Sequence, residues 1–394
     1  MGAVRVKRAF KYRFYPTDAQ AAELSRTFGC VREVYNLALA ARTEAWTLRQ
    51  ERINYNATSA MLTAWKKTDE LAYLNDVSSV PLQQALRHLQ TAFANFFGKQ
   101  AKYPRFKSRK KSRKSAEYTT SAFRFRDGKL TLAKMDQPLD IVWSRLLPEG
   151  AQPSTVTVSQ DAAGRWFVSL LVEDPAVQPL PATGTAVGVD AGLDHLLTLS
   201  TGEKITNPRL ERRDRTRLAR AQRELSRKGS GNRDKTRRKV ARIHARIADR
   251  RRDTLHKLTT RLVRENQTIV IEDLTVRNLL KNGRLARAIS DAAWSEFRSM
   301  VEYKAQWYGR EVIAVDRWFP SSKLCSTCGK LHPVGPHSYG RACLFGGRPP
   351  GSGGGVPHDL PVLGSLVRRV EQSTPWRKSS RRTAPGPSTA TPCG

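Results

Sequence analysis

The sequence predicts an α/β protein, because its C-terminal half alternates short apolar runs with longer helical patterns. Four short apolar runs have the length of strands; they occupy residues 187–190, 195–200, 268–272 and 312–315. Segments with apolar residues at helical spacing separate the last three runs. Strands that alternate with helices pack in layers, and this set predicts an α/β layer of the ribonuclease-H type.

The first hundred residues predict one strand followed by helices. Residues 5–16 alternate basic with apolar or aromatic side chains, which is typical of a strand with one exposed face. Thr17 or Asp18 can cap the helix that apolar spacing predicts over residues 19–47. A second helix fits residues 79–98, and we interpret the aromatic residues of both helices as helical core.

A basic segment follows at residues 99–114, with nine basic residues and no acid. Such a run is usually a solvated face, but aromatic residues and a proline interrupt this one. That mixture favours a loop that follows phosphates while its rings stack on bases. The predicted nucleic-acid contacts are Lys102, Tyr103, Arg105, Phe106, Lys107, Arg109 and Lys110.

The middle of the chain predicts first β-strands, then a linker and then basic helices. Residues 121–173 have a β pattern, and three prolines between 175 and 181 predict a linker. Residues 211–260 then hold 19 Lys and Arg against 6 Asp and Glu, with apolar residues at helical spacing. The KGSGN segment at 228–232 interrupts this pattern and predicts a basic helical hairpin.

The charge of the chain indicates a polyanionic partner. Lys and Arg number 69 against 35 Asp and Glu, which gives a formal net charge of +34 over 394 residues. Like charges repel in a compact state, so this excess does not serve folding. A membrane partner is disfavoured because no apolar run approaches the roughly 20 residues that span a bilayer. The N-terminus also lacks the apolar region of a signal peptide. We therefore predict a cytoplasmic protein that binds nucleic acid.

Two acids stand at strand ends, where they could hold a divalent cation. Asp190 ends an apolar run and is followed by small residues, and Glu272 ends the run IVIE. Nucleases that use two Mg²⁺ ions need several carboxylates that converge from neighbouring strands. The alternative is that each acid is an ordinary turn residue that meets solvent. The catalytic interpretation requires the two strands to be neighbours.

The cysteines predict part of a zinc site. Cys325 and Cys328 are three apart and precede a glycine, which is the spacing of a zinc knuckle. Cys343 lies at a suitable distance for a third ligand, but the position of a fourth is Gly346. His332, His337 or His358 could substitute, so a filled and an absent site both stay open. Five cysteines are too few for a disulfide framework.

Several ordered motifs resemble the TnpB (OrfB) proteins of insertion sequences. They are KRAFKYRFYPT, VYNLAL, KYPRFKSRK, VGVDAGLDHLLTLS, IVIEDLTVRNLLKN, DAAWSEF and RWFPSSKLCSTCG, and together they span about residues 5–332. The resemblance implies a wedge β-barrel formed by residues 1–18 and 99–180 and split by a helical recognition domain at 19–98. It implies a RuvC nuclease core at 185–322 with an inserted, here incomplete, zinc ribbon at 323–347.

The resemblance also implies an activity. Proteins of this kind cleave double-stranded DNA with Mg²⁺, guided by an RNA from the transposon end. Asp190 matches the first RuvC acid and Glu272 the second. Cys325, Cys328 and Cys343 match zinc ligands.

The sequence departs from the family after Cys343. The segment that carries the third RuvC acid is missing, and residues 348–394 have the composition of a disordered tail. Asp359 is the acid nearest to that place. We hypothesise that a frameshift rewrote the chain from about residue 333. The expected function is therefore an RNA-guided DNA endonuclease with impaired activity, and the alternative is a nuclease-dead protein that still binds DNA through its guide. A strand-transfer transposase is a third possibility, against which the resemblance argues.

Overall fold

The structure is a computed structural model that describes residues 6–227 and 232–315. The predicted zinc ligands Cys325, Cys328 and Cys343 lie outside the described residues, as do the segments predicted at 323–347 and 348–394. The chain divides into two compact units, one formed by the described residues up to 177 with 217–245, the other by 178–216 with those from 246 onward.

The first unit contains an antiparallel five-stranded sheet in the order β2-β6-β7-β1-β5. Its strands are β1 (Val6–Tyr15), β2 (Lys114–Thr119), β5 (Asp140–Val142), β6 (Thr155–Gln160) and β7 (Trp166–Asp174). β3 (Phe123–Arg126) and β4 (Lys129–Leu132) form a separate hairpin. β2 and β5 are the edges of the sheet, so the closed barrel that the resemblance implies is not confirmed by the described strands.

The first strand shows why this sheet forms. β1 is confirmed over nearly the predicted range, and Phe10, Tyr12 and Phe14 point into the core while the basic residues between them face outward. A period of two in the sequence therefore becomes one buried and one basic face. β1 pairs along its length with β7, from Val6 opposite Asp174 to Phe14 opposite Trp166.

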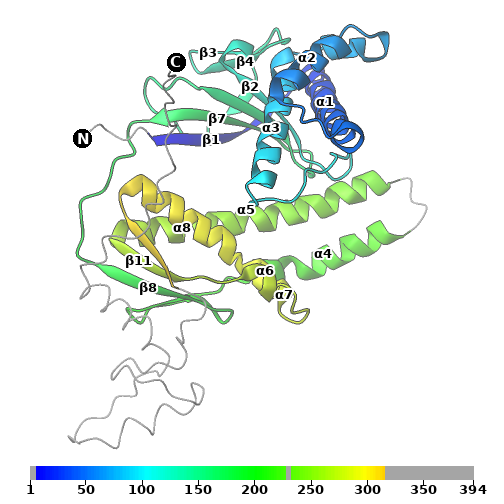
Figure 1. The fold of residues 1–394 in the computed structure, drawn as a ribbon. Helices are drawn as coiled ribbons and strands as arrows, with labels where there is room; N and C mark the ends of the chain where they lie inside the picture. The colour runs from blue at the N-terminus through cyan, green and yellow to red at the C-terminus, as the bar shows by residue number, and fades with distance from the viewer. Residues whose placement is uncertain (1–5, 228–231, 316–394) are drawn as a thin grey trace, which may run out of the picture. The chain divides into compact units, whose positions relative to one another are not determined.

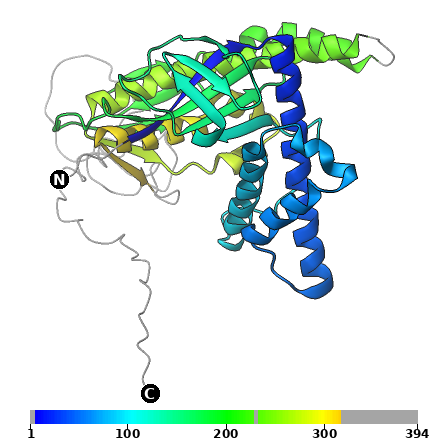
Figure 2. The same ribbon diagram turned by 90° about the horizontal axis from the view of Figure 1, so that it is seen from above.

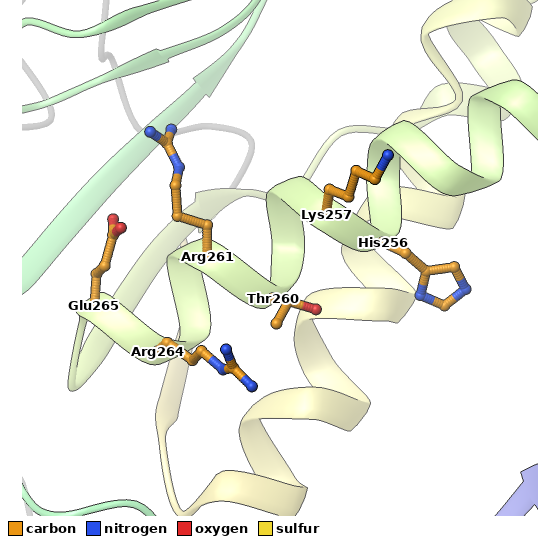
Figure 3. Close-up of a pocket in the computed structure, with 6 residues that line it drawn as sticks. All are labelled: His256, Lys257, Thr260, Arg261, Arg264 and Glu265. Atoms are coloured by element: carbon orange, nitrogen blue, oxygen red, sulfur yellow. The ribbon is translucent and has the colours of Figure 1, made fainter. Parts of the chain in front are cut away.

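Helices cover the same core. They are α1 (Asp18–Arg49), α2 (Tyr55–Trp65) and α3 (Ser79–Phe97), with short 3₁₀ helices η1 (Asp69–Asn75) and η2 (Thr120–Ala122). Thr17 caps α1: its hydroxyl accepts from the Gln20 amide at 3.2 Å, and the Gln20 side chain accepts from the Thr17 amide at 3.1 Å. α1 and α3 lie side by side (Figures 1 and 2). The predicted aromatic core is correct at Phe93 and wrong at Phe97, which is 62% exposed.

The second unit is built on a mixed five-stranded sheet in the order β10-β9-β8-β11-β12. Its strands are β8 (Ala186–Ala191), β9 (His195–Leu199), β10 (Lys204–Thr206), β11 (Thr268–Glu272) and β12 (Glu311–Val315). β9 is antiparallel to both of its neighbours, β8 and β10, whereas β11 runs parallel to both β8 and β12. All four predicted strands are confirmed in this one sheet.

Two helices pack on one face of that sheet. α5 (Arg233–Glu265) and α8 (Trp294–Tyr308) share a core with the alternate residues of β8 and β11. The residues that meet there are Val187, Val189, Ile269 and Ile271 from the strands, Leu255, Leu258 and Leu262 from α5, and Phe297 and Val301 from α8. The short helices α6 (Val276–Leu279) and α7 (Ala286–Ala292) connect β11 to α8 (Figure 1).

α5 pairs with α4 (Leu210–Ser226) as the predicted basic hairpin. Lys239 of α5 contacts Glu224 of α4 at 2.9 Å, and Arg250 contacts Asp214 at 3.0 Å. Leu218, Ile243 and Ile247 are buried, and the arginines around them stay exposed. No helix in the described part of the chain is both long and apolar enough to span a bilayer.

Candidate catalytic site

Asp190 and Glu272 lie on neighbouring parallel strands. β8 and β11 pair in register from Ala186 opposite Thr268 to Val189 opposite Ile271. Extending that register by one residue sets Asp190 beside Glu272, at the carboxyl ends of the strands. Neighbouring strands are about 4.8 Å apart, so the two acids share one edge of the sheet.

The alternation of side chains along the two strands predicts on which side the acids lie. Val189 and Ile271 both point into the core beneath α5 and α8. Successive side chains on a strand point to opposite faces, which predicts that Asp190 and Glu272 leave β8 and β11 on one common side; Glu272 also borders the cavity that α8 lines, and Asp190 does not. The condition that the sequence set for a joint metal site, that the two strands are neighbours, is met. Their catalytic role stays a prediction.

The environment of Asp190 disfavours the charged form of its carboxyl group. Burial raises the pKa of the Asp190 carboxyl above its ordinary value, and a hydrogen bond from the backbone of Ala191 offsets part of that rise. The turn beyond it depends on glycine, because a Cβ on Gly192 would lie 2.9 Å from the carbonyl oxygen of His195. The small residues that follow Asp190 therefore allow β9 to fold back directly beside it.

Beside Glu272 lies a cavity of about 380 Å³. Its wall combines the ends of β8 and β11 with the first turns of α8, and it is lined by Val189, Ala191, Ile271, Glu272, Leu274, Val276, Trp294, Ser295, Phe297, Arg298, Ser299 and Glu302. Arg298 bridges two acids there: it donates to the carboxylate of Asp273 and, at 2.8 Å, to that of Glu302. The guanidinium therefore holds the segment after Glu272 against α8.

The two carboxylates fit part of a divalent-metal site. Carboxylate oxygens are the ligands that Mg²⁺ prefers, and a cation would offset the cost of burying Asp190 in its charged form. Within residues 6–227 and 232–315, however, no group of three or more His, Cys, Asp and Glu side chains is arranged to hold a metal. The described site therefore offers two acidic ligands rather than three.

Of the nucleic-acid contacts predicted in residues 102–110, some are exposed and free of the fold's core, and others contact neighbouring residues of the protein. Arg105, Phe106, Arg109, Lys110 and Lys102 are exposed, as the prediction requires. Tyr103 is also exposed, at 42%, but its ring packs edge-on against Phe93 and Phe96, with ring centroids 5.5 and 5.3 Å apart.

Lys107 is held in the fold. Its ammonium lies 3.9 Å from the centre of the Tyr35 ring, and burial lowers the pKa of Lys107. Its backbone amide donates to the Asn36 side chain at 2.8 Å, and its carbonyl accepts from that side chain at 2.9 Å. Lys107 therefore anchors the loop at α1, and whether it also meets phosphate stays a prediction.

Sequence reasoning missed Arg298 and the partners of Tyr103. Arg298 lies 25 residues beyond Asp273, and nothing in the local pattern pairs them. The four aromatic residues at the end of α3 and in the next loop, Phe93, Phe96, Phe97 and Tyr103, were a visible signal. Their helical spacing suggested core, although a helix end exposes part of such a set.

The fold and the strand-end acids define a basic α/β protein of two units with two acids at one edge of a sheet. Several known proteins and protein families have a similar sequence. Residues 167–283 match the OrfB family of IS605, described as "Probable transposase". Residues 1–51 match the "Helix-turn-helix domain" of the same family, and residues 294–345 match the "Cas12f1-like, TNB domain".

Two relatives cover most of the chain. A protein of Streptomyces pristinaespiralis named "Putative RNA-guided DNA endonuclease" is 75% identical over 329 residues, which cover 83% of this chain and 82% of the relative. The InsQ protein of Escherichia coli K12, which has the same description, is 36% identical over 348 residues, with 82% and 83% covered. The chain belongs to the TnpB (OrfB) family.

A solved structure supports the fold alone. The protein chain of a Cas12f1–sgRNA–target DNA complex matches with a TM-score of 0.54 and 13% identity. The match covers 92% of this chain and 99% of that one.

Proposed function

We propose that this chain is an RNA-guided DNA endonuclease whose second unit is a RuvC-type, ribonuclease-H-like hydrolysis domain. The observation that carries the proposal is the parallel register of β8 and β11, which pairs Val189 with Ile271, the residues that directly precede Asp190 and Glu272. The relatives that bear the name of such an endonuclease, and the strand order of the sheet, support it.

Each residue of the site has a distinct part in the proposed reaction. Asp190 and Glu272 would hold Mg²⁺, which, when bound, stabilises the attacking and leaving oxygens of phosphodiester hydrolysis. Arg298 holds Asp273 and so fixes the end of β11 that carries Glu272. Asp190 lies on β8 between β9 and β11, and its pairing with Thr198 of β9 fixes its backbone at that edge.

The proposed activity is weaker than that of a complete site. Two acids come from the described strands, and the sequence after Cys343 has no segment of the kind that supplies the third. Losing one ligand weakens metal binding and lowers the rate of the chemical step. This missing acid also favours the second candidate, a nuclease-dead protein that binds DNA through its guide.

Nucleic-acid binding would be common to both candidates. The net charge of +34 and the exposed arginines of the α4–α5 hairpin suit contact with phosphates. The proposed partners are a guide RNA from the transposon end and a double-stranded DNA target. Cys325, Cys328 and Cys343 would contribute to a partial Zn²⁺ site, which metal analysis of the purified protein can test.

The deciding experiment is a cleavage assay on the protein co-expressed with RNA from the end of its element. Mg²⁺-dependent cleavage of guide-matched DNA that Asp190→Ala and Glu272→Ala each abolish would establish the endonuclease. Asp194→Ala is the matched control, because this acid lies just beyond β8 but its side chain is 96% exposed. Guide-dependent binding without cleavage would establish the second candidate. Cleavage that survives Asp190→Ala would refute the proposed site.

A further inference from the structure

A second cavity, of about 440 Å³, lies in the first unit at the end of the helical layer. It is formed by the last turns of α1 and α3, the segment between α1 and α2, and Tyr103. Its lining consists of Arg42, Trp46, Glu51, Arg52, Ile53, Asn54, Gln90, Phe93, Phe96, Phe97 and Tyr103. This volume is within the usual range for pockets that hold small ligands.

Aromatic rings dominate this cavity, and several are exposed. Phe97 is 62% exposed, Trp46 46% and Tyr103 42%. Phe93 lies behind them and stacks on Phe97 with ring centroids 6.2 Å apart. Large rings that gather in one hollow and remain in contact with water indicate a binding surface rather than core.

Contacts with α1 and α3 hold the Tyr103 ring in place. The hydroxyl groups of Tyr103 and Thr43 are 2.8 Å apart and hydrogen-bonded, which ties the loop after α3 to α1. Tyr103 also packs edge-on against Phe93 and Phe96. A preformed aromatic surface loses little conformational entropy when a flat ligand stacks on it.

Two arginines accompany the rings. The Arg42 guanidinium lies 4.1 Å from the centre of the Phe93 ring and donates to Gln90 at 2.9 Å. The guanidinium of Arg52 lies 5.7 Å from the Trp46 ring and 5.9 Å from the Phe97 ring. The one acid in the lining, Glu51, pairs with Arg49 at 2.8 Å, so its charge is offset. The cavity therefore offers flat apolar surfaces with cations beside them.

This combination fits one chemical class of ligand. An unstacked nucleotide presents a flat π-face and a phosphate, and proteins bind such nucleotides by stacking on aromatic and arginine side chains. An apolar peptide would use the rings but would gain nothing from Arg52. Within a chain of net charge +34, a polyanion is also the ligand that electrostatics favours.

We propose that this cavity binds one unstacked nucleotide of a single strand, with its base against Trp46 and Phe97 and its phosphate at Arg52. The inference rests on one part of the proposed function, namely that the chain binds nucleic acid. It does not depend on Asp190, Glu272 or cleavage.

Photocrosslinking of the full-length protein tests the proposal. The probes are a single-stranded RNA that carries 5-iodouridine and the matching DNA that carries 5-iododeoxyuridine, because these bases crosslink to aromatic rings on which they stack. We expect mass spectrometry to find the crosslink at Trp46, Phe97 or Tyr103. The probe that reacts identifies the strand as RNA or DNA.

Affinity measurements complete the test. Stacking of one base contributes roughly 1–3 kcal/mol, so Trp46→Ala and Phe97→Ala should each weaken binding of the reactive probe about 5- to 150-fold. Trp46→Phe should restore most of the affinity. The controls are Leu48→Ala and Tyr73→Ala, whose side chains are 70% and 44% exposed but do not line this cavity.

The outcomes separate this proposal from that of the endonuclease. Crosslinks confined to other residues, or unchanged affinity in both variants, would overturn the nucleotide site even if the protein cleaves DNA. Failure of both probes to bind would overturn it as well. A crosslink in the cavity from a protein that does not cleave would refute the nuclease and leave the nucleotide site standing.

Discussion

Arg298 of α8 donates a hydrogen bond to the carboxylate of Asp273, the residue that follows Glu272 at the end of β11. The same guanidinium donates to Glu302 at 2.8 Å. A single side chain thus connects the strand that carries a proposed metal ligand to the helix that covers the sheet. The contact affects the position of Glu272 without placing Arg298 on the substrate.

The first prediction compares two effects of the contact between Arg298 and Asp273. One is its contribution to the stability of the protein, and the other is its effect on the position of Glu272. Arg298 and Asp273 are each 35% exposed, so Arg298→Ala should lower the free energy of unfolding by only about 1 kcal/mol or less. Cleavage should fall more than this small loss explains, because Glu272 would no longer be fixed. Glu302→Ala, which removes only the second ion pair, is the control. Equal effects of the two variants on cleavage would contradict a positioning role.

The second prediction concerns pH and the raised pKa of Asp190. A carboxyl whose pKa rises on folding favours the folded state below its unfolded pKa, and that stability is lost as pH rises through the folded value. At neutral pH and without metal, charged Asp190 therefore destabilises the second unit. Asp190→Asn should stabilise it at pH 7, by roughly 1.4 kcal/mol for each unit of pKa shift. The gain should vanish below about pH 3.9, the unperturbed value.

Urea unfolding in the presence of EDTA, followed by hydrogen exchange in peptides from β8 and β11, measures this difference. Adding Mg²⁺ should stabilise the unsubstituted protein and leave Asp190→Asn unchanged, because a ligand stabilises only the state that binds it. A stability difference that does not depend on pH would mean that Asp190 is not desolvated in solution.

The central strands β8 and β11 of the second unit could be predicted because most of their residues are buried, whichever face they point to. Such strands have continuous apolar runs, as IVIE and VGVD do, and these runs identify them without any knowledge of the fold. α2, by contrast, was not predicted, although Asn54 accepts from the Ala57 amide at 2.9 Å as a standard N-cap. Its eleven residues bury only Thr58 and Leu62, so its apolar periodicity is weak.

The sequence predicted which residues could form the candidate site, but it did not predict how close they lie to one another. Asp190 and Glu272 end apolar runs, and each could be selected from its own neighbours in the sequence. Their proximity depends on the register of two strands that are separated by the whole basic hairpin. Register is set by which side chains the core accepts, and that is a property of the folded sheet rather than of either segment.

The third prediction concerns the exposed cations of the basic loop. Removing Arg105, Arg109 and Lys110 together should weaken RNA binding and reduce the salt dependence of the binding constant. Each lost phosphate contact lowers the slope of log K against log salt by about 0.7–0.9, so the triple variant should lose about 2–3. Replacement of Lys67, Arg126 and Lys129, which are also exposed, removes the same charge elsewhere and is the control. Equal slopes for the two variants would show that only net charge matters.

The fourth prediction tests how that loop is held. The Asn36 side chain on α1 bonds both the amide and the carbonyl of Lys107, at 2.8 and 2.9 Å. Asn36→Ala leaves both backbone groups without this partner, which should cost about 1–3 kcal/mol of unfolding free energy. RNA affinity should also fall, since the loop would lose its orientation before binding.

Lys107→Met distinguishes orientation from charge in the same loop. It keeps both backbone bonds to Asn36, but it removes the ammonium that lies over the Tyr35 ring. If the loop acts through its orientation, Asn36→Ala should weaken RNA binding more than Lys107→Met does, in filter-binding measurements at one fixed salt concentration. The reverse order would mean that the ammonium of Lys107 contributes more to RNA binding than the two backbone bonds to Asn36 do.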